Sequence, residues 1–338
     1  MRVHVISDIE GVSGVVKSEQ GDGGESLFEE ARRLYTEEIN AAIRGACAAG
    51  ATEVVVMDCH GAGKGWDFNS LLPEALDPRC EWVVQNEWTE YTGFLEEGCD
   101  AALFIGMHAR AGVADGVLNH TISGSDIFEL RFNGAPVGET GINAALCGTF
   151  ECPVVLVTGD DAVCREGREL LGEGLTTVAV KQGLGRNSAR NIAPQRAREM
   201  IEDGAERALA DLSAVAPYDP GHPCEIEVDL MGSHLVEPYR FRHGIEVVDG
   251  RRLVSKAGAE GVKAVAVLGD GSAAPFGLAL KIEDGDLAHR AGDVATSAAL
   301  ARLGVLDAEG LTRLGELAAP RISDPRGEIV GQVRAVLN

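Results

Sequence analysis

The chain has 338 residues, of which 45% are hydrophobic, so it can bury a sizeable core in one large domain or in two ordinary ones. It carries 30 basic and 53 acidic residues, a formal net charge of −23, and so acidic a surface argues against nucleic-acid and membrane-surface partners. No apolar stretch approaches the ~18–20 residues of a membrane span, and the first residues lack the apolar region of a secretory signal.

The first half of the chain alternates short apolar runs with amphipathic stretches. We expect strands at residues 2–7, 53–57, 101–105 and 153–157, and helices at residues 25–50 and 140–150. Alternation of strand and helix predicts an α/β fold with a mainly parallel sheet and helices on both faces. In such sheets the ligand crevice lies beyond the carboxyl ends of the strands.

The composition of the second half of the chain changes at two places, near residue 217 and near residue 250. We expect a helix at residues 191–212, a stiff proline-rich linker at 217–223 and an alternating, antiparallel-type strand at 224–230. Beyond residue 250 the chain is rich in Gly and Ala, with helices predicted at 286–303 and after 307. We therefore divide the chain into residues 1–250 and a small α/β segment of residues 251–338.

Polar residues come directly after three of the predicted strands. Asp8 and Glu10 follow the first strand, His60 the second and His108 the third. Carboxylates and imidazoles are the ligands of zinc and related divalent ions, and an Asp carboxylate can bridge two metals. Asp8 alone could cap a helix and His60 alone could be structural, but four such residues at three strand ends favour a metal site on this rim.

Two further residues can join the rim. His120 follows a glycine-containing loop that begins after His108, so it can fold back over the site. Glu139 opens a predicted helix, where it can either compensate the helix dipole or act as a fifth metal ligand.

Other candidate residues and motifs are weaker. Asp160 can cap a helix or support the site, and His4, inside a strand, is expected to be a core histidine. The chain has no P-loop and no G-x-S-x-G motif, which leaves an α/β-hydrolase triad unsupported.

The cysteines fit neither a disulfide framework nor a zinc ribbon. The eight cysteines contain no C-x-x-C pair. Most of them are therefore expected to be buried free thiols, and the compartment is expected to be the reducing cytoplasm.

Taken in order, these motifs resemble a known family. The chain contains SDIEG at 7–11, EINAA at 38–42, DCHG at 58–61, GMHA at 106–109, NHT at 119–121, GETGIN at 138–143 and GDD at 159–161. Together they are similar to the M55 metallopeptidases, a family of D-aminopeptidases, from the N-terminus to about residue 245. One departure is Cys59, where the family usually has Ser.

The resemblance implies a binuclear zinc aminopeptidase that releases N-terminal D-amino acids, chiefly D-Ala, from short peptides by a metal-activated water. It implies two Zn²⁺ per subunit, with Asp8 as the bridge and His120 as the catalytic residue; the remaining ligands would be Glu10, His60, His108 and Glu139. Members of the family form a homo-oligomer, a decamer of stacked rings, so the same assembly is expected for this chain.

The segment after residue 250 resembles a second family. Residues 253–262 and 277–285 are similar to the carboxyl-terminal part of the asparaginase II family. That family uses an upstream Ser-x-x-Lys pair, which this chain lacks. We therefore expect the segment to have a structural role.

Two alternatives stay open at this point. The same metal site could serve an amidase or esterase of another substrate class. The chain could also be a non-catalytic, metal-stabilised oligomer.

Overall fold

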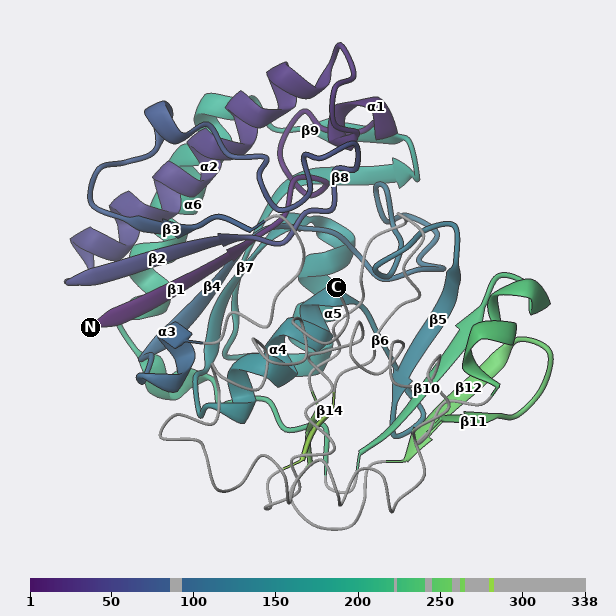
Figure 1. Cartoon of the computed structure of the whole chain (residues 1–338). Coiled ribbons are helices and arrows are strands. Elements are labelled where there is room, and N and C mark those ends of the chain that lie inside the picture. The colour runs from purple at the N-terminus through teal and green to yellow at the C-terminus, as the bar shows by residue number, and fades with distance from the viewer. Residues whose placement is uncertain (86–92, 222–223, 241–244, 257–261, 265–279, 283–338) are drawn as a thin grey trace, which may run out of the picture.

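A seven-stranded sheet forms the centre of the computed structural model, which describes residues 1–85, 93–221, 224–240, 245–256, 262–264 and 280–282 (Figure 1). Its strand order is β3-β2-β1-β4-β7-β8-β9. All neighbours are parallel except the hairpin of β8 and β9. The strands are β1 (Arg2–Ser7), β2 (Glu53–Asp58), β3 (Glu81–Val83), β4 (Ala101–Met107), β7 (Val154–Asp160), β8 (Thr176–Gly185) and β9 (Ser188–Asn191).

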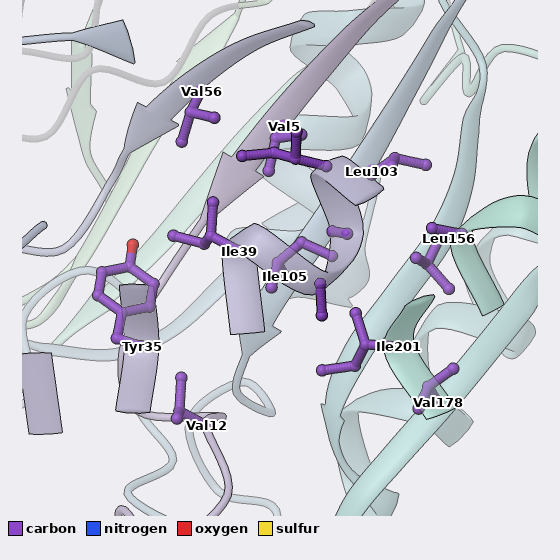
Figure 2. Packing of buried hydrophobic residues seen from close by; sticks show 14 of the residues in the cluster. Val5, Val12, Tyr35, Ile39, Val56, Leu103, Ile105, Leu156, Val178 and Ile201 are labelled. Carbon is purple, nitrogen blue, oxygen red and sulfur yellow. The ribbon is translucent and has the colours of Figure 1, made fainter. Parts of the chain in front are cut away.

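Helices cover both faces of this sheet, which confirms the predicted α/β architecture. The long helices α2 (Phe28–Ala48) and α6 (Pro194–Leu209) pack together on one face (Figure 1). The other face is covered by α3 (Gly93–Glu96), α4 (Glu139–Thr149) and α5 (Asp161–Leu171). Figure 2 shows the first of these cores, where Val5 and Leu103 from the strands meet Ile39 and Ile201 from the helices. Strands buried on both faces read as continuous apolar runs, which is why the sequence pattern finds them.

The expected elements of this sheet are present, with shifted ends. The helix expected at 25–50 is α2, and the helix expected at 191–212 is α6, which begins at Pro194 because Asn191 still belongs to β9. Strands β3 and β8 and helix α5 are not anticipated from the sequence pattern. Short helices fill the connections: α1 (Ser18–Gly21), η1 (Pro73–Ala75), η2 (Leu212–Ala214), η3 (Ser233–Leu235) and η4 (Glu237–Tyr239).

A second, antiparallel sheet packs against α4 through its own core. Its order is β11-β12-β10-β5-β6, with β11 (Ile245–Val247), β12 (Arg252–Lys256), β10 (Glu225–Leu230), β5 (Ile127–Phe132) and β6 (Ala135–Val137). Leu130 and Ile226 pack with Ile142 of α4 in this core. On β10 buried and half-buried residues alternate, as expected for a sheet with one covered face. Of these strands only β10 is predicted from the sequence.

The carboxyl-terminal segment is described only in part. Strand β12 lies beyond residue 250 and pairs with both β10 and β11. Strands β13 (Val262–Ala264) and β14 (Leu280–Ile282) form a separate antiparallel pair. The helices expected at 286–303 and after 307 lie outside the described residues. Among the described residues, no helix is both long and apolar enough to cross a membrane.

The strand order determines where a ligand can bind. From β1 the chain moves outward to β2 and β3, and then crosses to β4 on the other side of β1. The direction of winding therefore reverses between β1 and β4. In open α/β sheets the loops beyond such a reversal separate and leave a crevice at the carboxyl ends of the strands. Asp8 and His108 are the first residues after these two strands.

Candidate metal centre

The structure brings all six predicted site residues together. Asp8 and Glu10 follow β1, His60 follows β2, and His108 follows β4, three strands that lie side by side. Glu139 is the first residue of α4, and His120 lies in the loop between β4 and β5. The side chains are largely withdrawn from solvent: residue exposures are 2% for Asp8, 7% for Glu10, 6% for His60 and 1% for His108.

The two oxygens of Asp8 face two different groups of side chains. On one side His60 Nδ1 lies 3.2 Å from Asp8 Oδ1 and 2.9 Å from Glu10 Oε2. On the other, His108 Nε2 lies 3.5 Å from Asp8 Oδ2 and 3.3 Å from Glu139 Oε1. Ligand atoms held by a tetrahedral zinc at ~2.0–2.1 Å are ~3.3 Å apart, so both groups have suitable dimensions.

Each imidazole is oriented by a backbone carbonyl. His60 Nε2 lies 2.8 Å from the Gly21 oxygen, His108 Nδ1 lies 3.0 Å from the Ala109 oxygen, and His120 Nδ1 lies 2.8 Å from the Leu118 oxygen. Because a carbonyl only accepts, these nitrogens carry the hydrogen, and in a neutral ring the other nitrogen presents its lone pair. In all three residues that second nitrogen faces the carboxylates. This is the arrangement of metal-ligating histidines, whose other N–H is held by a neighbouring acceptor.

The donor set fits a divalent cation. Lone pairs of imidazoles and carboxylates repel one another unless positive charge lies between them. Two of the facing atoms, Glu10 Oε2 and His108 Nε2, are buried and have no hydrogen-bond partner. Asp8, Glu10 and His108 each offer a ligand atom within 4.8 Å of the others, and so do His108, His120 and Glu139.

His120 lies on the open side of the centre. Its Nε2 is 3.6 Å from Glu139 Oε1 and 3.9 Å from Glu10 Oε1, and its ring stacks on His108 with centroids 4.1 Å apart. Its side chain is 19% exposed, against 7% for His60 and 0% for His108. The loop does fold back over the rim, because Ile122 N donates to Glu139 Oε1 at 2.7 Å. His120 is thus the imidazole most accessible to a substrate.

The charges of the centre shift its pKa values strongly. Burial alone would lower the pKa of His60, but the carboxylates of Glu10 and Asp8 outweigh burial and hold it well above its ordinary value. The pKa of His108 is raised in the same way, chiefly by Glu139. Burial acts to raise the pKa of Asp8, yet its hydrogen bond with His60 and the neighbouring charges bring it below the ordinary value. Without a metal, therefore, the histidines carry the positive charge that the carboxylates require.

Two glycines let the β1 loop lie against the end of β4. Gly11 N donates to the Gly106 oxygen at 2.7 Å. A Cβ on Gly11 would come within 2.0 Å of the Met107 oxygen, and Gly106 itself has a φ of +73°. Side chains at either position would push the loop away and separate Asp8 from His108.

Two aspartates support the loops of the site, and the role of Asp58 is not predicted from the sequence. Asp58 accepts hydrogen bonds from the Tyr35 hydroxyl at 2.9 Å and from His60 N at 3.0 Å, so it holds the His60 loop. Asp160 takes both of its expected roles: it caps α5 by accepting from Val163 N, and it supports the β4–β5 loop by accepting from Val117 N. For Asp58, only its position at the end of β2 could have indicated this.

His4 is a core histidine, as expected. It is 1% exposed, and its Nδ1 lies 3.2 Å from the Val55 oxygen. Burial lowers the pKa of His4 to about 4.

The chain is similar to known proteins in sequence and in fold. The model of the D-aminopeptidase family, peptidase M55, matches residues 1–268, and the L-asparaginase II model matches residues 242–335. A D-aminopeptidase of Bacillus subtilis strain 168 is 31% identical over 261 residues, which are 75% of this chain and 90% of the relative. The solved structure of the Zn-dependent D-aminopeptidase DppA from Bacillus subtilis, a self-compartmentalizing protease, is 30% identical. The two structures match with a TM-score of 0.70, and the match covers 76% of this chain and 92% of the DppA chain.

The opposite pKa shifts give a direct prediction for metal-free protein. His60 and His108 should be imidazolium ions at neutral pH, whereas His4 should stay neutral until the pH falls to about 4. Adding zinc at neutral pH should release protons, and the apparent zinc affinity should fall as the pH drops below the raised pKa values. NMR of histidine-labelled protein after chelation measures the protonation states. Neutral rings at His60 and His108 in the metal-free protein would contradict this electrostatic account.

Proposed function

Because the chain belongs to the M55 family of D-aminopeptidases, we propose that it is a zinc-dependent aminopeptidase that releases N-terminal D-residues, chiefly D-Ala, from short peptides. One observation carries the proposal: the carboxylate of Asp8 is shared by two groups of donors whose imidazole lone pairs face inward. The zinc dependence of the similar Bacillus protein supports the choice of metal.

The donors divide naturally between two zinc ions. Glu10 and His60 lie beside Asp8 Oδ1, and His108 and Glu139 lie beside Asp8 Oδ2, so Asp8 would bridge. Zinc bound there would supply a Lewis acid for the peptide carbonyl and would lower the pKa of a bound water toward ~7. The fold contributes rigidity, because each imidazole is held in one orientation by a carbonyl.

His120 is the residue that we assign to proton transfer. Its Nδ1 is engaged with the Leu118 oxygen, so Nε2 is the nitrogen available to substrate. That atom can take a proton from the attacking water and return it to the leaving amine.

We also propose a homo-oligomer in the cytoplasm. The Bacillus relative is self-compartmentalizing, and the family resemblance points to a decamer. Apolar side chains remain exposed at the edge of the main sheet, Trp82 at 42% and Val84 at 59%. All eight cysteines are free thiols, which suits a reducing compartment.

A panel of small substrates tests the proposed activity. The zinc-loaded protein should hydrolyse D-Ala-D-Ala and leave L-Ala-L-Ala, acyl amides and esters uncleaved, with free D-alanine measured by chromatography. Preferential cleavage of an amide or ester would instead favour a hydrolase of another substrate class. Zinc binding with no turnover of any compound in the panel would favour a non-catalytic oligomer.

The bridging role of Asp8 predicts the metal content. Wild-type protein should hold two zinc ions per chain, and Asp8→Ala should lose both because each group of donors loses an oxygen. His60→Ala and His108→Ala should each lose metal as well. Asp203→Ala, at an exposed position on α6, is the matched control and should keep the full content. Elemental analysis after gel filtration gives the numbers; an unchanged load in Asp8→Ala would refute the bridge.

A separate variant distinguishes catalyst from ligand. His120→Ala should keep its zinc and lose activity by ~10²-fold or more, the scale of removing an acid–base group. The accessible position of the ring, on the open side of the centre, is the physical reason. If His120→Ala loses zinc as His108→Ala does, His120 is a ligand and the assignment fails.

For the carboxyl-terminal segment we propose a structural role. The sequence lacks a Ser-x-x-Lys pair, and an amide-hydrolysing serine needs such a base. The purified protein should therefore release no ammonia from L-asparagine. Ending the chain after Gly250 removes β12, the partner of β10 and β11, and should give aggregated protein, whereas residues 1–256 retain that strand. A soluble, fully active 1–250 fragment would overturn the proposed role.

A further inference from the structure

A buried lysine lies beneath the loop that carries Glu10. Lys181, on β8, is only 2% exposed. Its Nζ donates to the backbone oxygens of Glu10 at 2.5 Å, Val12 at 3.0 Å and Val15 at 2.6 Å. A carbonyl only accepts, so three such bonds need three hydrogens on one nitrogen. The group is therefore an ammonium ion, and all of its hydrogens are engaged by one loop.

The bonds to this ion are unusual for a buried cation. In the part of the chain that the structure describes, no carboxylate oxygen lies within ion-pair distance of Lys181 Nζ. A buried charge is costly unless it is paired or fully hydrogen bonded. Here its compensation comes from three converging carbonyl dipoles and from the field of the carboxylates of Asp160, Glu38 and Glu10 nearby. Burying an ammonium group to bind the carbonyls of one loop is so costly that it indicates a role for Lys181 beyond packing.

The same loop is held from its other sides as well. Glu38 of α2, 1% exposed, accepts from Ser13 N at 2.9 Å. Ser13 Oγ donates to the Ile192 oxygen at 2.5 Å, and Gly14 N donates to Asn191 Oδ1 at 2.9 Å. Helix α2 and the β8–β9 hairpin, which are far from each other in the sequence, thus fix the loop from residue 10 to residue 15. Only the carboxylate of Glu10 is left to face the metal centre.

We infer that Lys181 is a positioning residue for the metal centre, which fixes the backbone of Glu10 and so aims its carboxylate at His60. The carbonyl of Glu10 is bound by Lys181 Nζ, while its Oε2 lies 2.9 Å from His60 Nδ1. A fixed main chain sets the position of the Glu10 Cα, and thereby determines which rotamers of the side chain can reach His60. The inference rests on the proposed function only in taking zinc as the metal.

The decisive variant is Lys181→Met, which keeps the length of the side chain and removes every donor. The buried carbonyls of Glu10 and Val15 would then lose this donor, and that of Val12 would keep only its bond from Val15 N, so the loop would relax away from β8. Partners that orient metal ligands are typically worth 10–100-fold in metal affinity. We expect one of the two zinc ions, the one beside Glu10, to bind 10–100-fold more weakly, measured by competition with a chromophoric chelator.

Two control variants separate positioning from general stability. Lys64→Met removes an exposed lysine that pairs with Glu25, and its zinc affinity should equal that of the wild type. Ile201→Ala opens a cavity in the core under α6 and should lower the melting temperature without weakening zinc binding. If Lys181→Met lowers only the melting temperature, as Ile201→Ala does, Lys181 is merely structural and the inference is wrong.

A second substitution covers the case in which Lys181→Met does not fold. Lys181→Gln retains a shorter donor that can satisfy part of the loop, so its zinc affinity should fall between wild type and Lys181→Met. Unchanged affinity in this folded variant would also overturn the inference. Zinc affinity is measured without substrate, so failure to cleave D-peptides would count against the proposed function and leave this result intact.

Discussion

Lone pairs of three carboxylates and three imidazoles converge on one small, largely buried space, and much of the surrounding fold serves to hold them there. Such a group cannot persist without positive charge, either protons on His60 and His108 or metal ions in their place. Hydrogen bonds and close backbone contacts hold these side chains in place. Carbonyls orient the rings, Asp58 holds the His60 loop, and two glycines bring the β1 loop against β4.

The residues that face the metal centre can be predicted from the sequence because two simple rules apply to them. The strands are apolar runs that are easily recognised, and parallel strands bring the residues beyond their carboxyl ends to one edge of the sheet. Lys181, Glu38 and Tyr35 obey neither rule. Their partners are backbone groups and side chains far away in the sequence, so in the chain they look like ordinary strand or helix positions. Their contribution can be read only once the fold has brought those partners to them.

The second sheet shows where pattern analysis fails for a different reason. Strands β6, β11 and β12 are short, with three to five residues each, and charged residues on the open face of β5 interrupt its apolar alternation. Arg131 and Arg252 both pair with Asp229 across that face, at 2.9 Å and 2.7 Å. Side chains that look like loop residues in the sequence are thus cross-strand ion pairs. The same sheet contains β12, which lies in the region that both family models match.

The spread of the candidate ligands along the chain also affects how the protein folds. Apart from Asp8 and Glu10, each candidate ligand comes from a separate element, and parallel neighbours are joined only by long crossovers. These side chains therefore meet only through contacts between residues far apart in the sequence, which are slow to form because long loops must close first. Metal capture would come after the sheet has assembled, and bound zinc would slow unfolding rather than speed folding. The lifetime of the native state, and not the rate at which it forms, is then what the supply of metal controls.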